Sequence, residues 1–194
     1  MGRPDLTEVR TAEILDAFER CVARYGLHGS SLERVAEEAG MKRSVVRHYM
    51  GNRDEMVEAL AQRVAADCRD HLDAFVSSIS EGKRIEQLLA WFFPDSSHGT
   101  TDSLLAVESL IAAGEDYPKV RELMTAYVEG VVSMAAEQLR LAYPKAGRSQ
   151  CWTVAYGLVG ICFNHSSLSP LSLPTKYLKA ARTSARALIE TLAD

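Results

Sequence analysis

The chain has 194 residues, a formal net charge of −4, 47% hydrophobic residues and 25% charged residues. This balance is typical of a globular protein and excludes extensive disorder. The longest apolar stretches, such as residues 154–163, are too short to span a bilayer, and the opening MGRPDLTEVR carries charges where a signal peptide has an apolar run. We therefore expect a cytoplasmic protein with no membrane segment.

Apolar residues recur at helical spacing along almost the whole chain, which predicts an all-α protein of about nine helices. The first helix is expected over residues 7–25, where Ile14, Phe18, Val22 and Tyr25 form one apolar stripe. Further helices are predicted over residues 53–71, 84–93, 102–113, 118–143, 150–164 and 175–192.

Two short helices lie between the first helix and the one that begins at residue 53. The second helix starts at Ser30 or Ser31, and Ser30 with Glu33 has the spacing of a capping box. Gly40 ends it, and residues 43–50 form the third helix after a tight turn.

Residues 39–53 contain no acidic side chain, although the chain as a whole is acidic. Lys42, Arg43, Arg47 and Arg53 make this window basic. Two short helices joined by a glycine turn are typical of the helix-turn-helix unit, whose second helix enters the major groove of DNA. The window therefore predicts a surface that binds phosphates and base edges. The alternative is a solvated basic surface on a plain helical bundle.

Residues 7–60 resemble the N-terminal domain of the tetracycline-repressor (TetR) family of transcriptional regulators. The matching segments are AEILDAFERCVARYG and SSLERVAEEAGMKRSVVRHYMGNRDEMVEAL. The resemblance implies a DNA-binding domain over 1–52 and a ligand-binding and dimerisation domain over 53–194, with the helix at about 53–72 connecting them. It also implies contacts with double-stranded DNA from Ser31, Lys42, Arg43, Ser44, Val45, Arg47, His48, Tyr49 and Arg53.

Two positions depart from the family pattern. Arg47 stands where the family usually has tyrosine, and Met50 where it has phenylalanine. An arginine that binds guanine through two hydrogen bonds is worth about 1–3 kcal/mol of base discrimination, so Arg47 changes the expected operator sequence. Met50 is a flexible apolar residue that preserves the small core.

The family resemblance further implies a small-molecule pocket in the second domain and a homodimer through the helices at 150–164 and 175–192. Aromatic and apolar residues predict an apolar or aromatic effector, although the same residues also fit an ordinary core. The candidate ligand-binding residues are Trp91, Glu108, Tyr127, Met134, Trp152 and Tyr156. Ser109, His98 and Asn164 are further possible polar anchors.

The dimer prediction has support from the residues themselves. Gly157 and Gly160 lie inside one predicted helix, where glycine costs about 1 kcal/mol, so a close approach of a neighbouring helix is expected there. Leu178, Ala181, Ala185, Leu188 and Leu192 give the last helix a narrow apolar face that suits a four-helix dimer bundle. The alternative is that both helices pack within one subunit.

The sequence contains no motif of a catalytic site, and we expect neither an enzyme nor a cofactor or metal site. Cys21, Cys68, Cys151 and Cys162 form no C-x-x-C pair and are expected to be reduced, apolar thiols.

The sequence thus predicts a ligand-responsive regulator. A homodimer binds a palindromic operator and represses transcription, and an effector releases it by a movement that the connecting helix carries. The alternative is a helical ligand- or partner-binding protein with a vestigial DNA-reading head.

Overall fold

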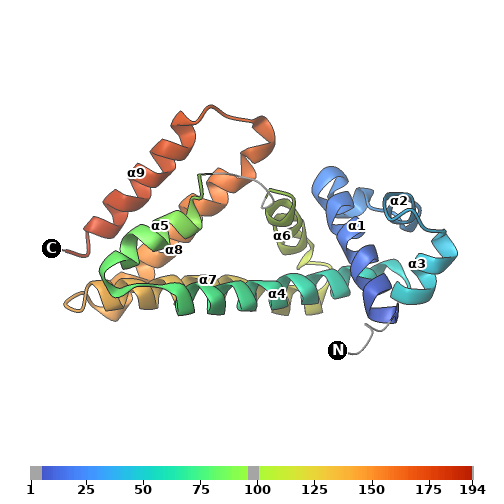
Figure 1. The fold of residues 1–194 in the computed structure, drawn as a ribbon, viewed down its shortest axis with the longest axis horizontal. Coiled ribbons are helices and arrows are strands. Elements are labelled where there is room, and N and C mark those ends of the chain that lie inside the picture. Colours follow the sequence, from blue (N-terminus) through green and yellow to red (C-terminus); the bar gives the residue numbers. More distant parts are fainter. Residues whose placement is uncertain (1–5, 96–100, 194) are drawn as a thin grey trace. The chain divides into compact units, whose positions relative to one another are not determined.

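The computed structural model of the protein describes residues 6–95 and 101–193, and every regular element within those ranges is helical (Figure 1). The expectation of an all-α fold with nine α-helices is confirmed for this part of the chain. In chain order the elements are α1 (Leu6–Gly29), α2 (Leu32–Glu38), α3 (Arg43–Met50), α4 (Arg53–Ser78), the 3-10 turn η1 (Glu81–Lys83), α5 (Arg84–Phe92), α6 (Thr101–Ala113), α7 (Pro118–Ala142), α8 (Arg148–Ser167), the 3-10 turn η2 (Ser169–Leu171) and α9 (Lys176–Glu190).

The junction between α1 and α2 differs from the sequence prediction in two respects. Ser31, not Ser30, caps α2, because its side chain accepts a hydrogen bond from the amide of Arg34 at 3.3 Å. Ser30 is buried and donates to the carbonyl of Gly26 at 2.8 Å, so the predicted capping box of Ser30 and Glu33 is wrong. Tyr25 was expected in the apolar stripe of α1 but is 46% exposed.

The reason lies at Gly26, whose φ of 68° and ψ of 169° interrupt the helix. This backbone conformation is open to glycine and costly for other residues. The chain therefore changes direction directly after Tyr25, and the tyrosine ring does not enter the core. Instead, the guanidinium of Arg34 lies over this ring, with Cζ 4.7 Å from the ring centroid.

The described chain packs as two compact units. The first contains α1, α2, α3, the part of α4 up to Ala66, α6 and the part of α7 up to Thr125. The second contains the remainder of α4 and α7 together with α5, α8 and α9. Both long helices therefore contribute to both units.

The core of the first unit lies between α1 and its neighbours. Ile14 and Phe18 of α1 are fully buried, and Val35, Val46 and Met50 fix the two short helices to them. The predicted place of Met50 in the small core is confirmed, and Val46 is buried as well. α6 also packs along α1, where Ala106, Val107 and Leu110 are buried.

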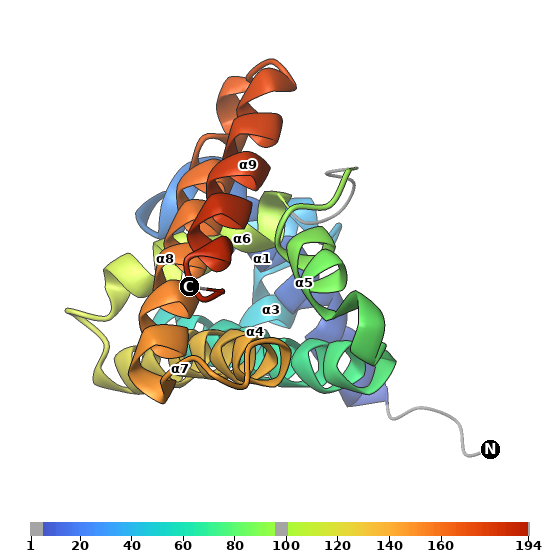
Figure 2. The same ribbon diagram turned by 90° about the vertical axis from the view of Figure 1, so that its left-hand side faces the viewer.

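In the second unit, α8 and α9 lie side by side in both views (Figures 1 and 2). Leu158 of α8 and Ile189 of α9 are fully buried between them and their neighbours. A Cβ atom built on Gly157 would lie 2.7 Å from a methyl carbon of Leu188. The expected close helix approach is thus confirmed at Gly157, whereas Gly160 has no atom within 4 Å of such a Cβ.

Gly51 generates the first testable prediction. It ends α3 with φ 71° and ψ −135°, and a Cβ there would meet a carboxylate oxygen of Glu55 at 2.0 Å. We expect Gly51→Ala to lower the free energy of unfolding by about 1–3 kcal/mol, measured by urea denaturation. Gly82→Ala is the matched control, because Gly82 has open space and no positive φ. Equal stability of the two variants would contradict this account of the α3–α4 junction.

Candidate nucleic-acid interface

α3 presents one apolar and one polar face. Val46 and Met50 are buried against the core, which turns the other side of this two-turn helix to solvent. Among the predicted DNA-contacting residues, Lys42, Arg43, Ser44, Arg47 and His48 are exposed, and Val45 and Tyr49 are half-buried. The structure therefore gathers the predicted recognition residues on one surface.

The arginines of this surface differ in their contacts within the protein. Arg43 Nε lies 2.9 Å from a carboxylate oxygen of Glu33, in a pair whose side chains are both more than half exposed. The Arg47 guanidinium makes no hydrogen bond or ion pair with any described residue. An exposed ion pair contributes little, so Arg43 can exchange its partner at small cost, while Arg47 is available without any exchange.

The first turn of α3 is also open. Lys42 occupies the N-cap position, and no side chain caps the amides that follow it. These amides and the helix dipole favour an anion at this end. Ser31 is exposed at the start of α2, where its hydroxyl accepts from the amide of Arg34.

Arg53, which was expected to contact phosphate, is engaged within the first unit. Its guanidinium donates to the carbonyl of Leu27 at 2.8 Å and to the hydroxyl of Tyr117 at 2.9 Å. The same tyrosine hydroxyl lies 2.9 Å from a carboxylate oxygen of Asp54. Arg53 thus fixes the start of α4 to the end of α1 and to the residue that precedes α7.

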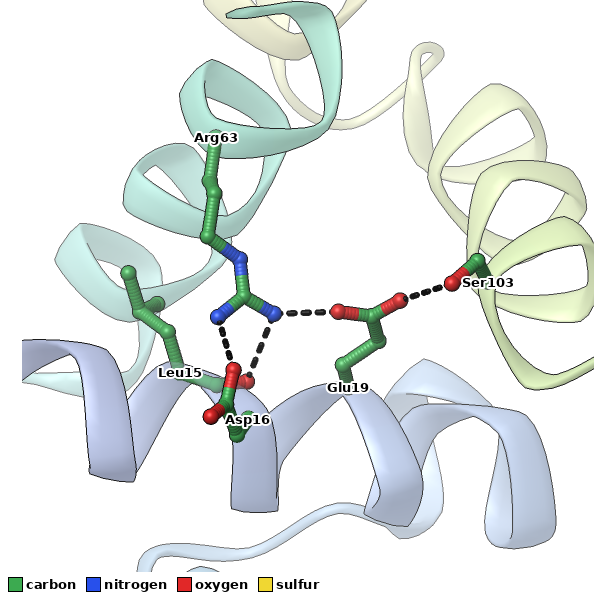
Figure 3. A network of polar contacts seen from close by, with 5 residues as sticks. All are labelled: Leu15, Asp16, Glu19, Arg63 and Ser103. Atoms are coloured by element: carbon green, nitrogen blue, oxygen red, sulfur yellow. Dashed lines mark hydrogen bonds and ion pairs between the residues drawn. The ribbon is translucent and has the colours of Figure 1, made fainter. Parts of the chain in front are cut away.

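Sequence reasoning missed a second polar network, around Arg63 of α4 (Figure 3). Arg63 binds Asp16 and Glu19 of α1, and Glu19 also accepts a hydrogen bond from Ser103 of α6. Met56, Leu60 and Arg63 follow helical spacing, which places an arginine next to two buried residues. That position could have indicated a buried partner, because an unpaired charge is rarely buried.

Three of the predicted effector-binding residues lie in one apolar cluster of the second unit. Trp91, Tyr127 and Met134 pack against it from α5 and α7. The Trp91 ring lies 5.3 Å from that of Phe75, measured between centroids. Burial raises the pKa of the Tyr127 hydroxyl, and the nearby thiols Cys68 and Cys162 add to the shift. The hydroxyl makes no hydrogen bond with the described residues.

Trp152 and Tyr156 do not join this cluster. They are 52% and 59% exposed on α8, and their rings stack on each other with centroids 5.7 Å apart. A hollow of about 490 Å³ lies further along α8, against α9. Its lining is rich in small residues and comprises Gly157, Gly160, Ile161, Asn164, His165, Leu168, Tyr177, Ala180, Ala181 and Ser184.

The remaining polar candidates are scattered. Glu108 and Ser109 are half-buried on α6 and so belong to the first unit, whereas Asn164 is exposed on α8 in the second. His98 lies outside the described residues. In the described ranges, no helix is long and apolar enough to cross a membrane, and no three His, Cys, Asp or Glu side chains are grouped to hold a metal ion.

A helix-turn-helix with an exposed basic second helix, attached to a helical second unit, defines the fold class of a DNA-binding regulator. The family model described as "Bacterial regulatory proteins, tetR family" matches residues 14–60. This match confirms the resemblance inferred from the sequence over the helix-turn-helix segment.

Known proteins are similar to this chain over different lengths. The HTH-type transcriptional regulator BetI of Burkholderia cenocepacia is 34% identical over 67 residues, 34% of each chain, so the match spans about a third of the curated relatives' length. A transcriptional regulator from Rhodococcus sp. has the same fold with a TM-score of 0.75 and 20% identity, over 93% of this chain and 96% of that one. A TetR transcription regulator from Haloarcula marismortui matches with a TM-score of 0.76 and 16% identity, over 95% and 98%.

The second testable prediction concerns Cys68 and Cys162, the two thiols of the aromatic cluster. Burial raises the pKa of Cys68 and of Cys162 to about 11. At pH 8 only about one thiol in a thousand is then a thiolate, the reactive form. We expect iodoacetamide to modify both residues slowly in the native protein at pH 8, faster as the pH approaches 11, and rapidly after unfolding, as measured by mass spectrometry.

Rapid native labelling of either thiol at pH 8 would contradict this prediction. It would also show that the cluster contains a reactive thiol rather than an apolar wall.

Proposed function

We propose that this protein is a ligand-responsive repressor that binds a palindromic operator in double-stranded DNA as a homodimer. The observation that carries the proposal is the exposed basic face of α3, free of acidic residues on a chain with a net charge of −4. A basic surface confined to one short helix suits groove binding, because the rest of an acidic chain repels the phosphates. Such a regulator acts where the DNA is, which makes the cytoplasm its location.

Each residue of this face has a role that follows from its environment. Lys42 and the uncapped amides of α3 bind phosphate, and Arg43 exchanges Glu33 for phosphate when DNA arrives. Ser44 and His48 face the groove beside them. Ser31, Val45 and Tyr49 form the edge of the surface, with the hydroxyls on phosphate and the valine in apolar contact.

Arg47 is the residue that selects the base sequence. It is exposed and lies one turn after Arg43, and no described residue competes for its guanidinium. Its planar donors match the O6 and N7 acceptors of guanine in the major groove. Each half-site of the operator therefore contains a guanine that faces Arg47.

The effector site is the apolar cluster of the second unit that contains Trp91, Tyr127 and Met134. Aromatic and thioether walls favour an apolar or aromatic molecule. The Tyr127 hydroxyl lacks a hydrogen-bond partner among the described residues and is the polar anchor. An effector releases the operator only if it binds the free and DNA-bound conformations with different affinity.

The dimer forms through α8 and α9. Gly160, which has open space around it, provides the small surface at which two copies of α8 cross. The stacked rings of Trp152 and Tyr156 are a second exposed feature of α8 that the partner copy covers.

Selection of randomised duplex DNA by the purified protein tests whether it binds a specific DNA sequence. We expect an enriched palindrome whose affinity falls by about a thousandfold between about 50 and 200 mM salt, because phosphate contacts release counterions. Arg47→Ala should cost about 1–3 kcal/mol per half-site and relax the preference for guanine, as measured by fluorescence anisotropy. Arg69→Ala removes an exposed arginine of the second unit and serves as the control.

If no duplex is enriched and binding is insensitive to salt, the regulator proposal fails. The protein is then a helical ligand- or partner-binding protein with a vestigial reading head.

Analytical ultracentrifugation tests the dimer. Gly160→Gln places a long side chain in the hollow, where one copy of the chain has space for it, and Trp152→Ala removes half of the aromatic stack. We expect each variant to weaken self-association at least about tenfold while helix content is unchanged. Leu141→Ala, at an exposed position of α7, is the control. Wild-type association in both variants would exclude this interface.

A further inference from the structure

Glu19 is the centre of a polar contact that joins three helices (Figure 3). Arg63 of α4 donates to a carboxylate oxygen of Asp16 at 2.6 Å and to the carbonyl of Leu15 at 3.2 Å. The same guanidinium forms an ion pair with one carboxylate oxygen of Glu19. The other oxygen of Glu19 accepts a hydrogen bond of 2.6 Å from the hydroxyl of Ser103, at the start of α6.

The ion pair of Arg63 and Glu19 is largely shielded from solvent, whereas the hydrogen bonds to Asp16 and Ser103 lie at the exposed edge of the contact. The side chains of Arg63 and Glu19 are only 19% and 18% exposed, in contrast to the more than half-exposed pair of Arg43 and Glu33. Arg63 Nε is buried and makes no hydrogen bond with the described residues. A shielded ion pair cannot exchange its partner for water at low cost, so it holds one geometry.

A second polar contact holds the other end of α6. Tyr117 follows α6 by four residues and directly precedes α7. Its hydroxyl donates to Asp54 and accepts from Arg53, each at 2.9 Å. Arg53 in turn donates to the carbonyl of Leu27, which lies in the last turn of α1, after the interruption at Gly26. Both ends of the α6 segment are therefore bonded to the helices that carry the helix-turn-helix.

The two contacts have a function that apolar packing between α1 and α6 does not supply. Apolar burial is not directional, so packed helices can slide against each other at small cost. Hydrogen bonds and shielded ion pairs are directional, and two of them at opposite ends of one segment fix both its position and its rotation.

We propose that Glu19, Arg63, Ser103 and Tyr117 are positioning residues of the DNA-reading unit. They make α6 and the start of α7 move with α1, α2 and α3 as one body, which holds the recognition helix at the angle its half-site requires. This inference rests on the proposed regulator function.

The test uses the double variant Ser103→Ala with Tyr117→Phe. It removes two hydroxyls, and with them both polar contacts of the α6 segment, but retains the bonds of Arg63 with Glu19 and of Arg53 with Leu27. Ser77→Ala with Tyr143→Phe is the matched control, because it removes the same groups in the second unit, where Ser77 bonds only within its own helix.

Two readouts on the full-length protein separate the inference from the function on which it rests. In hydrogen exchange without DNA, we expect amides of α6 to exchange at least about tenfold faster in the double variant than in the wild type or the control. With the selected palindrome, we expect the preference for the optimal half-site spacing over spacings one base pair longer or shorter to fall at least about tenfold. The base preference within each half-site should be unchanged.

Wild-type exchange of α6 or wild-type spacing preference in the double variant would overturn the inference. A loss of base preference together with spacing preference would also overturn it, because that pattern indicates a damaged helix-turn-helix rather than a released one. If the wild-type protein selects no palindrome, the regulator function fails, and unchanged exchange of α6 still decides against the two contacts.

Discussion

The shielded ion pair of Arg63 and Glu19 constrains the first unit more than any other polar contact that we describe there. Removing one partner of this pair is destabilising, because the remaining charge is largely shielded and loses its counter-charge. Arg63 reaches three groups on α1, so α4 cannot rotate about its axis without losing all of them. The orientation of α1 then follows from that of α4, and α2 and α3 follow from α1 through Val35, Val46 and Met50.

The two short helices α2 and α3 have to pack against the core on one side and leave cations available on the other. The inner face is apolar and nearly without polar atoms, so it needs no partner that DNA binding could disturb. The outer face carries cations whose contacts within the protein are few and exposed. Arg53 and Arg63 lie outside this division, because their guanidinium groups bond within the unit and keep the orientation of the outer face fixed.

Much of the fold could be predicted from the sequence, because local features determine it. Helical periodicity placed every α-helix in the described ranges, and residues such as Gly40 and Pro118 marked boundaries close to those observed. The surface of α3 was also predictable, since Val46 and Met50 fix which side of an eight-residue helix is buried. Periodicity alone misplaced Tyr25, because the backbone turns at Gly26 immediately after it.

The polar contacts of α6 could not be predicted, because they join residues that are far apart in the chain. Ser103 lies 84 residues from Glu19, and Tyr117 lies 64 residues from Arg53. Nothing in the spacing of a serine or a tyrosine on its own helix indicates such a partner. The same limit applies to Trp152 and Tyr156, since helical spacing aligns them with Val159 but does not say which neighbour covers that side of α8.

The chain's two tryptophans lie in different environments, so their fluorescence differs. Trp91 packs among Phe75 and Phe92, whereas Trp152 is half exposed and stacked on Tyr156. Emission from the first indole is shifted to the blue and shielded from a dissolved quencher such as iodide, while emission from the second is shifted to the red and open to it. A ligand in the aromatic cluster would change the emission of Trp91, and a partner on α8 would change that of Trp152. One fluorescence experiment without a label therefore distinguishes the two events.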